Sequence, residues 1–187
     1  MFELLDRTQP HSVQFHAEHY SLAYREEEER EMFPTLKHFG VGSIPWSPLA
    51  RGTLTRPLSQ QTKRSETDRL IKNYKGGDIV NRSYNKPISN THSVEELAKK
   101  RGISMAQVSL AWVMNRPGVT APIIGTTSLD NLKQLLGEWN LVYVALLRPF
   151  NFDHGNTAAE AIDIILTDEE MKYLEEPYQP QGIIGHS

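Results

Sequence analysis

The pattern of apolar and polar positions is most regular over Ser104–Leu136, and we expect the rest of the chain to be organised around this stretch. Apolar residues recur at close to helical spacing from Met105 to Val113. Ser104 and Gln107 form a capping box in front of them, and Pro117-Gly118 ends the helix. The pattern therefore predicts a buried helix followed by a tight turn.

A short apolar segment and a second helix follow this turn. The segment Ala121–Ile124 is too short and too apolar for an exposed helix, so we expect a buried parallel strand that bends at Gly125. The next helix, over residues 129–136, opens on three hydroxyl residues, and its free amides would point back across the end of the strand. Such amides favour a phosphate, but Ser128 acting only as a helix cap is an equal alternative from the pattern alone.

Two shorter strands are expected upstream. Residues 12–17 alternate weakly, and Val41–Trp46 forms a second short apolar run. Between them an acidic run, Glu26–Glu29, begins a helix that Gly40 ends, and its charges are most simply a solvated helix face that matches the helix dipole. This succession is typical of βα units, whose sites collect at the carboxyl ends of the strands. Trp46 lies at such an end, although packing in the core is the simplest interpretation of a single Trp.

The remaining chain is less regular. Residues 53–82 are polar and predict a surface loop that passes into a helix from about Glu66. Capping boxes at Ser93–Glu96 and Thr167–Glu170 predict helices that end at Gly102 and before Pro177. Two segments, 83–92 and 138–157, interrupt this order and resemble insertions, because neither shows a clear period.

Composition narrows the class of protein. The chain of 187 residues is 39% hydrophobic and 23% charged, which suits one domain with a real core. A net charge of -3 without a basic block implies neither a nucleic acid nor an anionic membrane as partner. The absence of cysteine excludes disulfides, thiolate catalysis and cysteine zinc sites. No apolar run approaches the roughly 20 residues of a membrane span, so we expect a soluble, cytoplasmic protein.

The histidines near the start of the chain do not predict a metal site. His11, His16 and His19 lie at odd spacings, so that successive members of the set point to opposite faces of a strand. Unrelated roles for the three imidazoles are the better interpretation, and we assign no metal.

Four segments, taken in order, resemble the aldo-keto reductase superfamily, and in particular its fungal aryl-alcohol dehydrogenase-like members. They are IPWSPLARGTLTRP, VEELAKKRGISMAQVSLAWV, PIIGTTSLDNL and LTDEEMKYLEEPY. The resemblance covers Tyr20–Arg82, Val94–Gly137 and Ala161–His186.

The resemblance implies an α/β fold and a function. Members are (β/α)8 TIM barrels that transfer a hydride between a nicotinamide cofactor, usually NADP with NAD not excluded here, and a small aldehyde, ketone or alcohol. By the match, Trp46 resembles the residue that stacks on the nicotinamide, and the loop that holds the pyrophosphate is Ser47, Pro48, Leu49, Ala50, Arg51 and Gly52. The residues that resemble contacts to the adenosine end are Gly125, Thr127, Asn131 and Gln134.

The chain also departs from the family pattern. The family's acid-base tetrad of Asp, Tyr, Lys and His lies upstream of the matched region, and none of its motifs occurs here, so we assign no catalytic residue. Ala17 stands where relatives often carry a Gln that bonds the nicotinamide amide, and Leu135 replaces a commonly polar contact. No Arg or Lys follows Gly125, which leaves a preference for the 2′-phosphate unsupported.

Only three convincing strands can be placed, whereas a complete barrel needs about 250 residues and eight strands. We therefore expect residues 1–187 to form one incomplete domain, made of roughly the last three βα units of a barrel and a C-terminal helix. Both edges of such a sheet are unpaired, which favours self-association.

The sequence leaves three hypotheses open. The chain is part of an NAD(P)(H)-dependent reductase, or it is a nucleotide-binding remnant that lacks chemistry. Alternatively, it is a non-functional product of a truncated gene, or of one whose exons are wrongly assigned, with segments 83–92 and 138–157 as translated non-coding sequence. Sequencing the mature transcript separates the third from the others.

Overall fold

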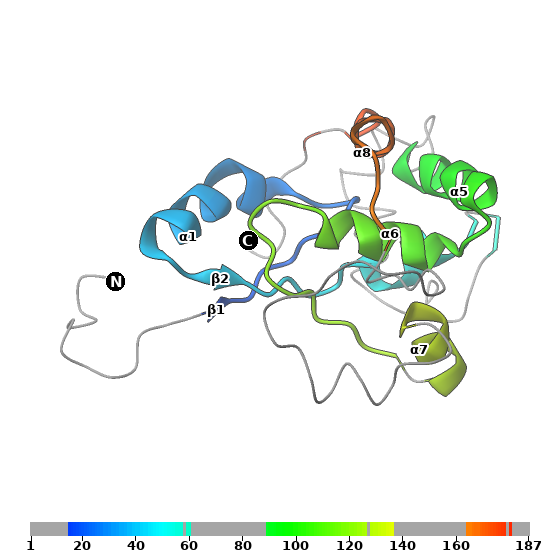
Figure 1. Ribbon diagram of the computed structural model, residues 1–187, viewed down its shortest axis with the longest axis horizontal. Helices are drawn as coiled ribbons and strands as arrows, with labels where there is room; N and C mark the ends of the chain where they lie inside the picture. Colours follow the sequence, from blue (N-terminus) through cyan, green and yellow to red (C-terminus); the bar gives the residue numbers. More distant parts are fainter. Residues whose placement is uncertain are drawn as a thin grey trace.

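The architecture is that of a computed structural model, which describes residues 15–57, 59–60, 89–126, 128–136, 164–178 and 180. Figure 1 shows the short strands with the helical segment 28–39 at one end, and the helices of residues 89–136 and 168–175 at the other. In chain order the elements are β1 (Phe15–His16), the π-helix η2 (Glu28–Met32), α1 (Phe33–Phe39), β2 (Gly42–Ser43), the 3-10 helix η3 (Ala50–Thr55), α5 (Ser89–Arg101), α6 (Met105–Met114), α7 (Leu129–Leu136) and α8 (Asp168–Glu175).

The strands are parallel, as the sequence predicts. In the two-stranded sheet Phe15 pairs with Gly42 and His16 with Ser43. Single parallel bridges extend this pairing, because His19 pairs with Trp46 and two residues of the segment 119–124 pair with Ser43 and Trp46. Three extended segments therefore run side by side, with the β2 segment in the middle.

The prediction that Ala121–Ile124 is a buried strand is only half right. Its direction is confirmed by the parallel bridge between Ile123 and Trp46. Ile123 is nevertheless 49% exposed. A strand becomes buried on both faces only when helices cover both, and only one face of this segment is covered in the part of the chain that the structure describes.

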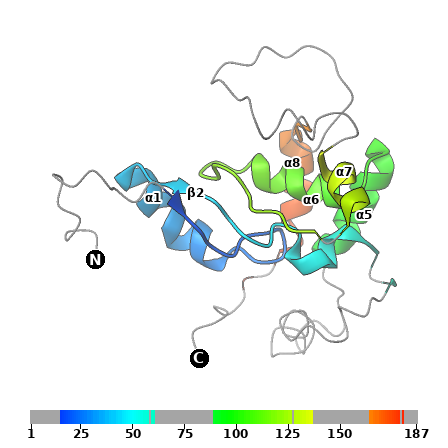
Figure 2. The same ribbon diagram turned by 90° about the horizontal axis from the view of Figure 1, so that it is seen from below.

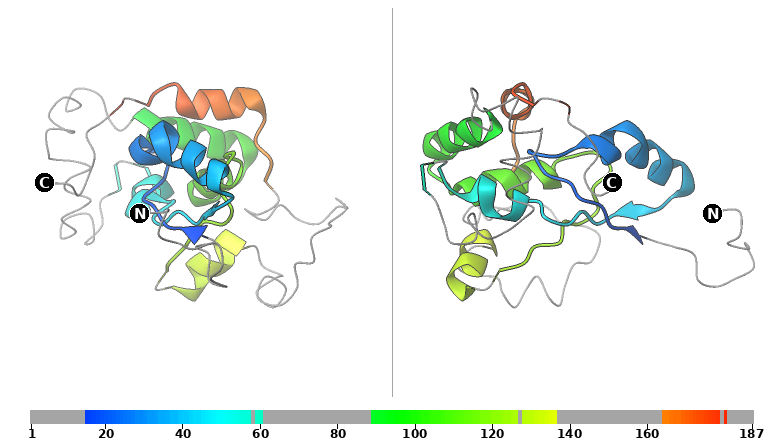
Figure 3. Two further views of the ribbon diagram at one scale, coloured as in Figure 1. Left: turned by 90° about the vertical axis from the view of Figure 1, so that its left-hand side faces the viewer. Right: turned by 180° about the vertical axis from the view of Figure 1, so that it is seen from behind.

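Helix α6 is the centre of the core. Every residue from Met105 to Val113 is buried except Gln107, so this helix is covered all round. It packs against α5, η3 and α7. Figures 1 and 3 show that α7 and α8 lie on opposite sides of α6, and Figure 2 shows the strands and α1 beyond one end of this group.

Local signals place most helix ends correctly. The capping boxes at Ser104 and Thr167 are both formed, each with two reciprocal hydrogen bonds. Gly40 and Gly102 follow α1 and α5 with φ of 66° and 67°, a left-handed conformation that glycine adopts without steric cost.

The predicted start of α5 is wrong. The helix begins at Ser89, so Ser93 lies inside it and does not cap it, and the last four residues of the insertion-like segment 83–92 are helical. The reason is packing, because Thr91 is 1% exposed and continues the buried face of Val94 and Leu97 by one turn.

The prediction of a solvated acidic face is also wrong. Glu26 and Glu28 are 6% and 0% exposed, whereas Glu29 and Arg30 are exposed. The run passes into a π-helix at Glu28, and the side chains of Glu28 and of Glu26, which precedes the π-helix, both lie inside the fold.

Several expectations lie outside the described residues: the helix from about Glu66, the segment 138–157, and His11. In the described ranges, no helix is both long and apolar enough to cross a membrane.

Candidate functional site

Backbone pairing brings the two predicted halves of the site together. The Ile123 amide donates to the Pro45 carbonyl oxygen at 2.7 Å, and Trp46 and Ile123 form a parallel bridge. The turn 47–52 leaves directly after Trp46, and Gly125 follows two residues after Ile123. Both therefore lie at the carboxyl ends of neighbouring parallel segments, where βα folds hold their ligands.

A small second hydrophobic core packs against both the turn 47–52 and the segment 119–124. Leu49 of the turn and Ile124 of the third segment pack against a buried cluster of Ala106, Leu110 and Leu135. Since the last three belong to α6 and α7, one group of apolar contacts fixes the turn, the strand end and the following helix.

The turn 47–52 has an unusual backbone. Ser47, Ala50 and Arg51 have φ of 57°, 47° and 56°, and they include every non-glycine residue with positive φ in the part of the chain that the structure describes. Gly52 continues the turn at 96°. Left-handed conformations cost about 1 to 3 kcal/mol each for residues with a Cβ, and they persist where surrounding contacts impose them.

The contacts that hold the turn are hydrogen bonds within it and contacts of the next residues with α6. The amides of Ala50 and Gly52 donate to the carbonyl oxygens of Ser47 and Leu49, each at 2.9 Å. Leu54 is fully buried, and its carbonyl oxygen accepts a hydrogen bond from Ser109 Oγ on α6 at 3.1 Å. The strained turn is therefore anchored to the most buried helix of the molecule.

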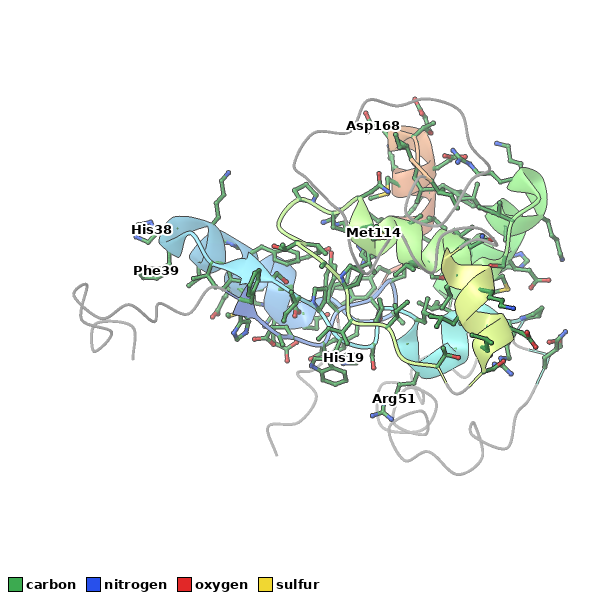
Figure 4. The ribbon with its side chains drawn as sticks, turned by 60° about the horizontal axis from the view of Figure 1, so that its bottom comes forward. His19, His38, Phe39, Arg51, Met114 and Asp168 are labelled. Atoms are coloured by element: carbon green, nitrogen blue, oxygen red, sulfur yellow. The ribbon has the colours of Figure 1, made fainter. Side chains whose placement is uncertain are left out.

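Trp46 is not a core residue. It is 37% exposed, and its indole stacks on the His19 imidazole with ring centroids 4.3 Å apart and planes 12° apart. His19 also stacks on the buried Tyr24, at 4.8 Å and 15°. Burial and then the charge of Arg51 lower the pKa of His19 to about 4, so the imidazole is neutral near pH 7. Figure 4 shows His19 and Arg51 on the same side of the molecule.

The start of α7 uses its hydroxyls as caps. Ser128 Oγ accepts from the Asn131 amide at 3.4 Å, and Thr126 Oγ1 accepts from the Ser128 amide at 3.2 Å. Ser128 therefore caps the helix, but the amides of Leu129 and Asp130 still have no acceptor inside it. Gly125 and Asn131 are exposed beside them, Gln134 lies in α7, and Thr127 lies outside the described residues.

Tyrosine hydroxyls elsewhere are tied to carboxylates. Tyr20 donates to Glu29 at 2.7 Å, Tyr178 donates to Glu26 at 2.7 Å, and Tyr173 bonds to Glu96. Burial raises the pKa of Tyr20 and Tyr178, and the hydrogen bond to Glu96 raises that of Tyr173. These three hydroxyls hold their protons tightly, the opposite of what a proton donor to a carbonyl requires.

A pocket of about 370 Å³ lies at the other end of α6. It contains none of the residues matched to the cofactor. Its lining residues are Asn115, Arg116, Pro117, Leu166, Asp168, Met171, Lys172 and Glu175.

Sequence reasoning missed the role of His19. The spacing of the histidines along the chain addresses only whether they could bind a metal together. In the structure His16 pairs with Glu18, whereas the His19 ring stacks on Trp46. The contact between His19 and Trp46 follows from the register in which their two segments pair. The hydrophobic pattern of neither segment predicts that register.

The chain matches known proteins over most of its length. A family model described as aldo/keto reductase family matches residues 5–146. A putative aryl-alcohol dehydrogenase, AAD16, from Saccharomyces cerevisiae is 36% identical over 163 residues, which are 87% of this chain and 39% of that protein. The versiconal hemiacetal acetate reductase of Aspergillus parasiticus is 38% identical over 160 residues, 84% of this chain and 38% of that one.

The fold agrees with these matches. The crystal structure of a thermostable aldo-keto reductase, Tm1743, in complex with the inhibitor epalrestat superposes with a TM-score of 0.51 at 18% identity, over 88% of this chain and 39% of that one. The chain thus has part of the TIM-barrel fold of this family and spans about two fifths of the length of the relatives that it matches. It belongs to the aldo/keto reductase family, whose members are oxidoreductases.

Proposed function

We propose that this chain carries the cofactor-holding part of an NAD(P)(H)-dependent oxidoreductase that interconverts a carbonyl and an alcohol. The observation that supports this most is the pairing of Trp46 with Ile123, which sets the turn 47–52 and the start of α7 at one end of the sheet. In barrel terms these residues correspond to the last three βα units and a C-terminal helix.

The proposed contacts follow the length of a dinucleotide. The exposed indole of Trp46 takes the nicotinamide, and amides of the turn 47–52 take the pyrophosphate. Gly125 and the first turn of α7 take the adenosine end, with Thr127, Asn131 and Gln134 as its polar contacts. The amides of Leu129 and Asp130, which have no acceptor within the helix, suit a phosphate there.

Binding and turnover separate in this proposal. The cofactor supplies the hydride, but carbonyl reduction also needs a proton donor, whose contribution is typically a hundred- to ten-thousand-fold. The family's tetrad motifs do not occur in these 187 residues. We therefore propose that the isolated chain binds the dinucleotide without turning it over.

A titration of the purified chain with NADPH, and separately with NADH, tests the proposal. We expect enhanced fluorescence of the reduced nicotinamide on binding, and Trp46→Leu should weaken it. Phe39→Leu is the matched control, since Phe39 is also exposed, at 52%, but lies at the far end of α1 (Figure 4). No fluorescence change with either cofactor would remove the proposal.

A second measurement separates the remaining hypotheses. Loss of reduced-cofactor absorbance with an aromatic aldehyde present would show an active reductase in this chain alone. Binding without such a loss supports the nucleotide-binding part proposed here. Neither binding nor turnover would favour the non-functional product.

A further inference from the structure

His19 and Trp46 are held together by their backbones before their rings meet. They form a parallel bridge, the Trp46 amide donates to the Glu18 carbonyl oxygen at 2.7 Å, and the Tyr20 amide donates to the Trp46 carbonyl oxygen at 3.4 Å. Paired residues of neighbouring strands project to the same face of a sheet. The near-parallel rings, 12° apart, are thus a product of the register.

The stack of three rings is buried at Tyr24 and partly exposed at Trp46. Tyr24 is fully buried, and two backbone hydrogen bonds to Ser21, of 2.9 and 3.1 Å, fix its position. His19 lies on Tyr24, and Trp46 lies on His19 with 37% of its surface exposed. The buried Tyr24 ring therefore limits the orientation of the His19 ring, and His19 in turn limits that of the Trp46 indole.

We propose that His19 is the positioning residue of the cofactor site: it covers one face of the Trp46 indole, fixes the plane of that ring, and leaves the other face for a nicotinamide. This inference rests on the proposed function. A planar ligand gains from stacking only if its partner ring is held in place, because otherwise binding must also order the indole.

The charge state of His19 suits this role. Burial of the ring and then the Arg51 guanidinium on η3 lower the pKa of His19, so the imidazole is neutral, while Glu18 on the same segment pairs with His16. The stack therefore brings no positive charge of its own to the ring that would meet an oxidised, cationic nicotinamide.

Two variants of similar size separate stacking from mere space filling. His19→Phe keeps a flat ring, whereas His19→Leu fills the position without one. Affinity is measured for NADPH and for adenosine 2′,5′-bisphosphate, a fragment that lacks the nicotinamide. Circular dichroism confirms that both variants fold.

We expect His19→Leu to weaken NADPH binding by about two- to tenfold, the range typical of one aromatic contact, and to leave the fragment's affinity unchanged. His19→Phe should bind NADPH like the wild-type chain. Equal weakening by Leu and Phe, an equal loss for the fragment, or no loss in either variant overturns the role of His19 while the proposed function survives. A wild-type chain that binds none of NADPH, NADH and the fragment overturns both.

Discussion

Two regions, each built around a tryptophan, differ in whether their polar groups find partners within the chain. Trp112 is fully buried, its Nε1 donates to Glu175 at 3.0 Å, and the Arg116 guanidinium lies over its ring at 5.3 Å. Trp46 lies half-exposed at the end of the sheet beside a strained turn. We call the group Tyr20, Glu29, Trp112, Arg116 and Glu175 the closed cluster, and Trp46, the turn 47–52 and the start of α7 the open end.

The closed cluster satisfies its polar groups internally. Arg116 alone donates to Tyr20, Glu29 and Glu175 at 2.7 to 3.0 Å. Partial burial acts to lower the pKa of Arg116, but Tyr20 and then the two carboxylates raise it above its usual value. At the open end the backbone is held in costly conformations and two helix amides lack an intrahelical acceptor. The difference indicates that the first region stabilises the fold, whereas the second is the region for which we propose a cofactor.

The largest expected effect is in the closed cluster. Arg116→Ala removes three hydrogen bonds and the ion pairs of Arg116 with the partly buried Glu29 and Glu175, and the ion pair that Glu29 then keeps is the longer one to Arg25 at 3.9 Å. We expect a loss of about 3 kcal/mol in the free energy of unfolding, measured by urea denaturation. Lys99→Ala is the control, because its ion pair with Glu95 is largely exposed and should be worth less than about 0.5 kcal/mol. Similar losses in both variants would contradict the comparison.

Acid should act on the open end through His19. Its pKa is about 4 in the folded chain and about 6.5 when unfolded, so between these values the unfolded state binds more protons. Stability from this group is complete above pH 6.5 and falls as the pH is lowered towards 4, by about 2 to 3 kcal/mol. The measurement is the difference in unfolding free energy between wild type and His19→Phe at pH 7 and at pH 4.5. If that difference is the same at both pH values, the interpretation fails.

Glu28 is buried beside Glu29 of the closed cluster, but its side chain forms no hydrogen bond with the members of that cluster. Neither of its carboxylate oxygens has a hydrogen-bond partner among the described residues. Burial raises its pKa to about 8, its own backbone amide acts in the opposite direction, and the nearby charges of Glu18, Glu27 and Glu29 add to the rise. Since the unfolded group ionises above about 4.5, its contribution to stability falls as the pH rises from 4.5 to 8.

Glu28→Leu should therefore stabilise the chain, by about 1 to 2 kcal/mol at pH 8 and by less at pH 5. Thermal unfolding at the two pH values measures this. Glu31→Leu is the matched control, because Glu31 is exposed on the same π-helix and should change stability little. Destabilisation by Glu28→Leu at pH 8 would show that its carboxylate has a partner after all.

The smallest expected effect separates strain from charge at the open end. Arg51→Gly relieves a φ of 56° and should raise stability by about 1 kcal/mol, whereas Arg51→Ala keeps the strain and should not. Both remove the guanidinium and should weaken NADPH binding equally. Unequal losses of affinity would mean that the shape of the turn, and not the charge, governs binding.

The sequence predicted the features that depend on neighbours along the chain. The capping boxes at Ser104 and Thr167 and the terminators Gly40 and Gly102 are confirmed, because each acts within one turn of its helix. The expectation that Trp46 and Gly125 share one end of a parallel sheet is also met.

The features that the sequence did not predict depend on packing between distant segments. Glu28 looks like one more solvated acid until the π-helix turns it inward, and α5 starts early because Thr91 finds a place in the core. The His19–Trp46 stack needs a register that neither segment specifies. The roles of the cofactor-facing residues stay predictions that the binding experiments test.

The π-helix Glu28–Met32 has a consequence for changes in chain length. The Phe33 amide donates to the Glu28 carbonyl oxygen five residues back, so this turn holds one residue more than an α-helical turn would. Deleting a single residue here would let the segment wind as an ordinary α-helix while Leu36 still faces the core and Gly40 still ends α1. The helix thus has a point at which the chain can lose one residue without rotating α1 against the core.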